Sequence, residues 1–112
     1  VAHVSAQMET ALAGYPPEKA GELVLAYEPI WAIGTGRTPS PEFADGVCRA
    51  LRGVVENLFG PSAAQDVRVL YGGSVKPGNA ALFFEKDDID GGLIGGAALK
   101  ADDFIAIVKA DR

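Results

Sequence analysis

The chain has 112 residues, of which 48% are hydrophobic and 22% charged, with a formal net charge of −5 at pH 7. This composition is typical of a globular domain and excludes a disordered chain, while the acidic balance argues against nucleic acid or an anionic membrane surface as a partner. The apolar runs are far shorter than the roughly 20 residues that cross a bilayer, so no membrane span is expected.

The only cysteine, Cys48, cannot form an internal disulfide. A secreted chain of this size more often carries an even set of cysteines, so we expect a cytoplasmic location. The first residue, Val1, already falls inside a helical pattern, and the one methionine is Met8. We therefore interpret the sequence as a piece of a longer chain, holding one domain at most.

The first predicted element is an amphipathic helix. Apolar residues recur at spacings of three and four up to Leu12, and Gly14 follows as a stop. After a loop over residues 15–21, the segment ELVLAYE (Glu22–Glu28) is a mostly continuous apolar run. Such a run is typical of a strand covered on both faces in a parallel sheet. A long loop follows over residues 29–39.

The second helix is the most strongly marked. Ser40 and Pro41 form an N-cap followed by proline at the first helical position, and Gly60-Pro61 marks the end. Its apolar face is predicted to comprise Phe43, Val47, Leu51, Val54, Val55 and Leu58.

Two further strand and helix pairs complete the chain. We predict strands at Val67–Tyr71 and Ile89–Ile94, and helices over residues 77–84 and 102–110. Each strand ends in a loop that contains glycine. The alternation of strands and helices predicts an α/β fold with a parallel sheet, either open or closed into a barrel. An eight-unit barrel needs roughly 250 residues, so this chain holds three to four units and leaves two bare sheet edges.

Candidate chemistry lies at the carboxyl ends of the strands, where loops converge in α/β sheets. Glu28 ends the first strand, and from its position alone it is either a surface carboxylate or a catalytic one. The glycine pairs Gly72-Gly73 and Gly95-Gly96 follow the other strands. Backbone N–H groups in such loops can hold a phosphate without lysines, although isolated glycine pairs more often form ordinary tight turns.

Three segments together carry a resemblance to a known family. The segments AYEPIWAIGTG (26–36), YGGSV (71–75) and GGLIGGAAL (91–99), in this order and spacing, resemble triosephosphate isomerase. The resemblance implies a partial TIM (β/α)8 barrel, with about three βα units after a preceding helix. Residues 1–112 would be the carboxyl-terminal part of a single barrel domain, from about the fifth helix onwards.

The implied reaction interconverts dihydroxyacetone phosphate and glyceraldehyde 3-phosphate through an enediolate, in glycolysis and gluconeogenesis. Glu28 would be the general base that moves the proton, with no metal or redox cofactor. The residues agree with this role, because a carboxylate backed by Leu25 and covered by Ile33 would lose solvation when the loop closes, which would make it a stronger base.

The resemblance also assigns a phosphate site and a lid. The phosphate donors would be Gly34, Ser74 and Gly96, with Gly95 beside them. Residues 29–38 would form the lid, which includes Pro29, Trp31 and Thr35 and shields the intermediate from water.

The hydroxyls of Tyr71 and Ser74 would latch the closed lid. The family's partner for Tyr71 is a backbone N–H at the position of Pro39, and proline has no N–H to donate. We therefore expect a shifted partner, such as the amide of Ser40, or a lid that is held less firmly.

Other polar residues favour structural interpretations. His3 is expected on the surface, Cys48 as a small buried apolar group, and residues 85–88 as a solvated turn.

The family's electrophilic histidine, its substrate-binding lysine and its homodimer loop belong to the missing amino-terminal half of the barrel. An isolated chain is therefore expected to be inactive and to self-associate through its open strands. Two alternatives stay open: another phosphate-binding barrel enzyme, and a non-catalytic half-barrel that binds phosphate.

Overall fold

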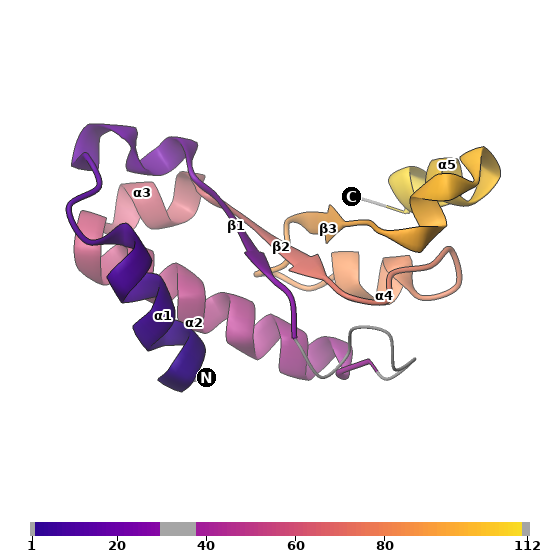
Figure 1. The fold of residues 1–112 in the computed structure, drawn as a ribbon, viewed down its shortest axis with the longest axis horizontal. Coiled ribbons are helices and arrows are strands. Elements are labelled where there is room, and N and C mark those ends of the chain that lie inside the picture. The colour runs from indigo at the N-terminus through magenta and orange to yellow at the C-terminus, as the bar shows by residue number, and fades with distance from the viewer. Residues whose placement is uncertain (1, 30–37, 111–112) are drawn as a thin grey trace.

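The computed structural model describes residues 2–29 and 38–110 and has the expected α/β alternation (Figure 1). In chain order the elements are α1 (Ala2–Leu12), a 3₁₀ turn (Pro17–Glu22), β1 (Val24–Tyr27), α2 (Pro41–Phe59), α3 (Pro61–Asp66), β2 (Arg68–Gly72), α4 (Ala80–Phe84), β3 (Gly91–Leu93), a second 3₁₀ turn (Gly96–Leu99) and α5 (Ala101–Lys109).

The three strands form one parallel sheet in the order β1-β2-β3. Tyr27 pairs with Tyr71, and Gly72 pairs with Leu93. Parallel pairing brings the carboxyl ends of all three strands to one edge of the sheet. The α/β class and the parallel sheet of a partial barrel are confirmed, and in the described residues the sheet does not close.

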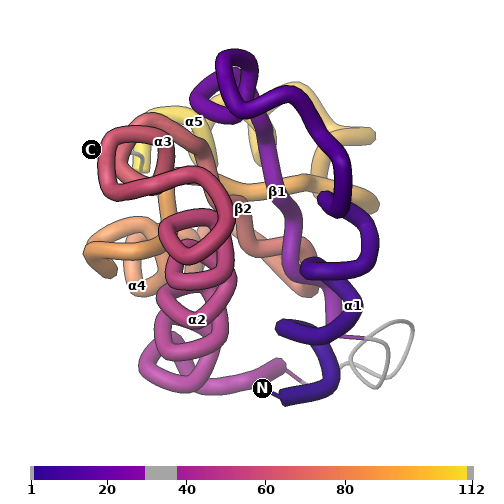
Figure 2. Tube along the Cα trace, turned by 90° about the vertical axis from the view of Figure 1, so that its left-hand side faces the viewer, coloured from indigo at the N-terminus to yellow at the C-terminus, as the bar shows by residue number. Residues whose placement is uncertain are grey.

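The core lies between one face of the sheet and the helices. Alternate strand residues, Leu25, Tyr27, Val69 and Tyr71, face this side and are at most 8% exposed. They pack with the apolar face of α2, and α1 and α2 lie side by side (Figure 2). Burial of each large apolar side chain contributes on the order of 1.5–3 kcal/mol, so this layer fixes the positions of the strand ends.

The opposite face of the sheet is largely exposed in the described residues, most clearly at β1. Val24 is 59% exposed and Leu93 51% exposed, and Ala26 and Glu28 are also exposed. The prediction that the first strand is covered on both faces is therefore wrong for this chain. Its side chains alternate between a packed face and an open one, because no described element packs on the second side.

Several boundaries differ from the prediction for local reasons. Gly60 does end α2, but Pro61 then starts α3, which the sequence reasoning missed because it treated Gly60-Pro61 only as a stop. Gly60 has a φ of +99°, which lets the chain turn sharply between the two helices. Residues 77–79 form a turn, so α4 is shorter than the predicted helix.

The start of α2 confirms the predicted cap, since the Ser40 hydroxyl accepts a hydrogen bond from the Phe43 N–H at 3.1 Å. The buried face of α2 is narrower than predicted, because Phe43 is 50% and Leu58 43% exposed near its two ends. The four apolar residues between them on that face are buried, as predicted.

An ion-pair network joins α2 to the segment before β3. Arg52 donates to Asp88 at 3.0 Å and to Asp90 at 2.7 Å, and also to the carbonyls of Ala64 and Val67. Asp90 additionally accepts from the Val69 N–H at 2.9 Å. The network fixes β3 beside β2 through side chains as well as through the ladder.

Residues 85–88 form the predicted turn, but the prediction that they are solvated is wrong for Lys86 and Asp88, which are only partly exposed. The Asp88 side chain is 16% exposed and also binds Arg49, while Lys86 pairs with Glu42 at 3.4 Å. The partly buried carboxylate of Asp88 is stabilised here because it has two cationic donors, Arg49 and Arg52.

Candidate functional site

The predicted site residues follow the strands at one edge of the sheet. Glu28 comes directly after β1, Ser74 lies two residues after β2, and Gly95 and Gly96 lie just beyond β3. Pro29 is buried next to Glu28. The predictions for Trp31, Ile33, Gly34 and Thr35 fall outside the described residues.

The second and third strand ends share a cleft of about 360 Å³. Ser74, Gly95 and Gly96 line it, together with Lys76, Lys100 and Asp103. A Cβ on Gly95 or Gly96 would meet no atom within 4 Å, so the backbone there is open to the cleft rather than packed. The two lysines and the accessible backbone N–H groups are donors that a small anion requires, whereas the Asp103 carboxylate is an acceptor and opposes an anion.

Glu28 lies next to this cleft but lines a different one. A Cβ placed on Gly72 would be 3.5 Å from the Glu28 Oε1, so the carboxylate sits over the end of β2, where the Gly72–Ser74 loop begins. Its own cleft is formed with residues of α1 and with Leu51. The side chain is exposed in this chain, and the expected cover by Ile33 falls outside the described residues.

Tyr71 is fully buried and stacked on Phe83, with ring centroids 4.4 Å apart and planes within 6°. Its hydroxyl lies against Gly73, where any side chain would collide with it. No hydrogen bond to this hydroxyl is formed in the described part of the chain, although the Ser74 backbone N–H lies near it. Burial raises the pKa of Tyr71, and the neighbouring Tyr27 adds to this effect, while the Ser74 amide opposes it.

The loop after β2 is held by a residue that the sequence reasoning did not select. The Asn79 side chain accepts a hydrogen bond from the Lys76 N–H at 2.7 Å and donates one to the Ser74 carbonyl at 2.9 Å. The sequence signal was an asparagine just before α4, which is more simply interpreted as a helix cap.

The structural interpretations of His3 and Cys48 are confirmed. His3 is exposed on α1. Cys48 is fully buried, and burial, with added repulsion from Asp45 and Asp88, raises its pKa to about 12. The described residues contain no group of three or more His, Cys, Asp or Glu that could hold a metal ion.

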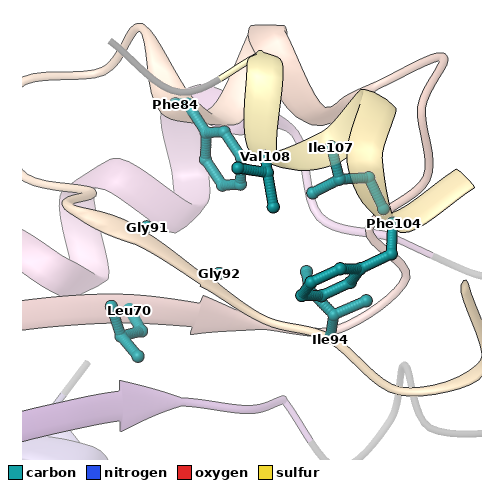
Figure 3. Close-up of a pocket in the computed structure, with 8 residues that line it drawn as sticks. All are labelled: Leu70, Phe84, Gly91, Gly92, Ile94, Phe104, Ile107 and Val108. Atoms are coloured by element: carbon teal, nitrogen blue, oxygen red, sulfur yellow. The ribbon is translucent and has the colours of Figure 1, made fainter. Parts of the chain in front are cut away.

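A pocket elsewhere in the molecule is apolar and contains none of the predicted site residues. It lies between β3 and α5, has a volume of about 370 Å³, and is lined by side chains such as Phe84, Phe104 and Val108 (Figure 3). Within the described residues, no helix combines the length and apolarity that a membrane span requires.

A comparison of the sequence with models of known protein families finds a match over nearly the whole chain. The profile described as triosephosphate isomerase matches residues 1–111. The chain belongs to the triosephosphate isomerase family. This confirms the resemblance carried by the three segments, and it favours triosephosphate isomerase over other phosphate-binding barrels.

Three relatives named triosephosphate isomerase illustrate the similarity. The chain is 55% identical to that of Chlorobium phaeobacteroides over 107 residues, which are 96% of this chain and 42% of the relative. It is 61% identical to that of Flavobacterium psychrophilum over 87 residues (78% and 35%) and 50% identical to that of Lactococcus lactis over 106 residues (95% and 42%). The chain thus spans about two fifths of the length of these triosephosphate isomerases.

Proposed function

We propose that this chain is the carboxyl-terminal portion of a triosephosphate isomerase, from about the fifth helix onwards. Completed by the amino-terminal part of the barrel, it interconverts dihydroxyacetone phosphate and glyceraldehyde 3-phosphate. The proposal depends on one observation, that the three strand ends lie close together. Glu28 at the end of β1 lies beside Gly72 of β2. Ser74 after β2 lines the same cleft as Gly95 and Gly96 after β3.

Glu28 acts as the general base in this proposal. It takes a proton from the carbon beside the carbonyl and returns it to the neighbouring carbon of the enediolate. The backbone position of Glu28 is fixed because it directly follows β1, whose residues Leu25 and Tyr27 are buried in the core. Closure of a lid over residues 29–38 removes water from the carboxylate and makes it a stronger base.

The cleft between the second and third loops holds the phosphate. Ser74, Gly95 and Gly96 supply donors from this chain, with Gly34 of the lid as a fourth residue. Lys76 and Lys100 add positive charge at the rim, which favours approach of a dianion to an acidic protein. No resident metal or redox cofactor takes part in the proton transfer.

The intact protein acts in the cytoplasm as a homodimer. The amino-terminal half supplies the electrophilic histidine and the substrate-binding lysine of the family. The isolated chain has no isomerase turnover above buffer and self-associates through the open edges of β1 and β3. A soluble monomer with normal turnover would refute this part of the proposal.

A second candidate function is a half-barrel that binds phosphate without catalysis. It is favoured by one observation: Ser74, Gly95 and Gly96 line a single cleft within this chain alone. This candidate predicts phosphate binding that survives Glu28→Gln, with no isomerase activity restored by an amino-terminal half.

A barrel chimera tests both candidates. In it, this chain replaces the matching stretch of the Chlorobium phaeobacteroides relative; mixing the chain with that relative's remaining residues gives a two-chain version. We expect isomerase activity in the chimera and a loss of about 10³-fold in kcat with Glu28→Gln, the scale of general base catalysis. Glu22→Gln, an exposed glutamate near the opposite end of β1, is the matched control. An inactive chimera, or one indifferent to Glu28→Gln, would favour the half-barrel.

A further inference from the structure

Asn79 stands where a helix cap is expected but does not cap its helix. It is the residue before α4, and asparagine at this position normally accepts a hydrogen bond from an amide of the first turn. Here the side chain makes no such bond with α4. It is turned back to the loop, where it bonds Lys76 and Ser74 instead. Because the Asn79 side chain bonds the loop and leaves α4 without a cap, we interpret its role as stabilising the loop.

The bonds around this loop engage its carbonyl groups. The Gly73 carbonyl accepts from the Val75 N–H at 3.0 Å, and the Ser74 carbonyl accepts from the Asn79 side chain at 2.9 Å. The Lys76 carbonyl accepts from the backbone N–H groups of Asn79 and Ala80. Asn79 therefore contributes a donor to two of these three carbonyls, one from its side chain and one from its backbone.

Engaged carbonyls matter for an anion site, because a carbonyl oxygen carries partial negative charge and repels a phosphate. The backbone N–H groups of a loop can bind an anion when they point into the site and the neighbouring carbonyl oxygens point away from it. Ser74 lines the cleft that it shares with Gly95 and Gly96, so a rotated Ser74 carbonyl would change the groups facing the ligand. Asn79 itself is not among the residues that line this cleft.

We propose that Asn79 is a positioning residue for the phosphate site, which keeps the Ser74 carbonyl out of the cleft and fixes the turn over residues 73–76 in its anion-binding form. The proposal rests on the proposed function, since it assigns a role in holding the substrate's phosphate.

The test measures inorganic phosphate affinity in the barrel chimera, using the amide NMR shifts of Ser74 and Gly96 during a titration. Asn79→Ala removes both side-chain bonds. Asn79→Asp keeps the acceptor for the Lys76 N–H and loses the donor to the Ser74 carbonyl. Each is expected to weaken phosphate binding about tenfold, equivalent to the loss of one good hydrogen bond. Asn57→Ala, which removes an exposed asparagine of α2, is the control and should stay within about twofold.

A second readout separates positioning from general damage. The kcat/KM for glyceraldehyde 3-phosphate should fall about tenfold in both Asn79 variants, mainly through KM, while kcat/KM for phosphate-free glyceraldehyde stays within about twofold. Equal losses on the two substrates, or phosphate affinity like that of Asn57→Ala, would overturn the proposal. A chimera that binds phosphate and responds to Asn79 but has no isomerase activity would refute the proposed function alone. A chimera that binds no phosphate would refute both.

Discussion

Replacing Arg52 tests whether the ion-pair network holds the third strand in place. Arg52 is 18% exposed in its side chain and donates to two carboxylates and two carbonyls within 3.1 Å. Burial works against its charge, yet bonding to Asp90 and Asp88 raises the pKa of Arg52 overall. Arg52→Met leaves these acceptors without their shared donor. Removing one partner of a buried pair costs about 3–5 kcal/mol in general.

The expected loss is smaller here, because both carboxylates keep another donor. Asp88 retains Arg49 and Asp90 retains the Val69 N–H, and the two side chains are 16% and 25% exposed. We therefore expect Arg52→Met to lower the free energy of unfolding by about 2–3 kcal/mol. Arg52→Lys should lose about half as much, because lysine keeps the charge but lacks the guanidinium fork.

Urea unfolding of the barrel chimera, followed by circular dichroism, measures these losses. Arg49→Met is the comparison, since Arg49 binds Asp45 and Asp88 from a side chain that is 65% exposed, and its loss should be much smaller. The loss at Arg52 should also persist at high salt, because pairs shielded from solvent are weakly screened. Equal losses at Arg52 and Arg49 would refute the reasoning that burial gives this network its strength.

Four further predictions concern single positions. Cys48 has a pKa of about 12 in the fold against an ordinary 9.0, so between these pH values the unfolded chain releases a proton that the folded chain retains, and stability falls as pH rises. In Cys48→Ala the free energy of unfolding should fall less steeply with pH. An equal slope in both proteins would contradict a contribution from Cys48, because Tyr27 and Tyr71, whose pKa values are also raised, would then account for the whole slope. Gly53→Ala should raise the free energy of unfolding by about 0.5–1 kcal/mol, because Gly53 lies inside α2 and a Cβ there meets nothing within 4 Å. Gly60→Ala, at a φ of +99°, should be destabilising in the same urea titration, and a gain there would be the contrary result. Tyr71→Phe should leave stability unchanged or raise it by about 1 kcal/mol, because the removed hydroxyl is buried without a partner in the described residues. If that hydroxyl latches the lid, the same variant should release more eliminated phosphate per isomerised product; an unchanged ratio would show that it latches nothing.

Local signals explain which elements could be predicted. The Ser40-Pro41 start of α2 and the three strands each follow from short-range patterns. The structure confirms them, with β1 and β3 shorter than predicted and β2 shifted by one residue. The short helix α3 was missed because proline and glycine mark both the end of one helix and the start of another. The ion-pair network was missed because Arg52 and its carboxylate partners are 36 and 38 residues apart, and only folding brings them together.

In the candidate site, too, short-range patterns identified some residues, whereas contacts that form only on folding could not be predicted. Glu28, Ser74 and Gly96 could be selected from the sequence because each follows a strand and matches a family segment. Their grouping in space was only partly predictable, since Ser74 and Gly96 share a cleft while Glu28 lines its own. Asn79 could not be selected, because an asparagine before a helix is far more often a cap than a loop support.

The strand order β1-β2-β3 repeats the order of the chain, and the sheet leaves its two outer edges unpaired in the described residues. In the barrel that we propose, the amino-terminal part would therefore join the sheet along these two edges only. It would not have to be threaded between strands that are already paired. We accordingly expect such a barrel to assemble from two separately synthesised polypeptides.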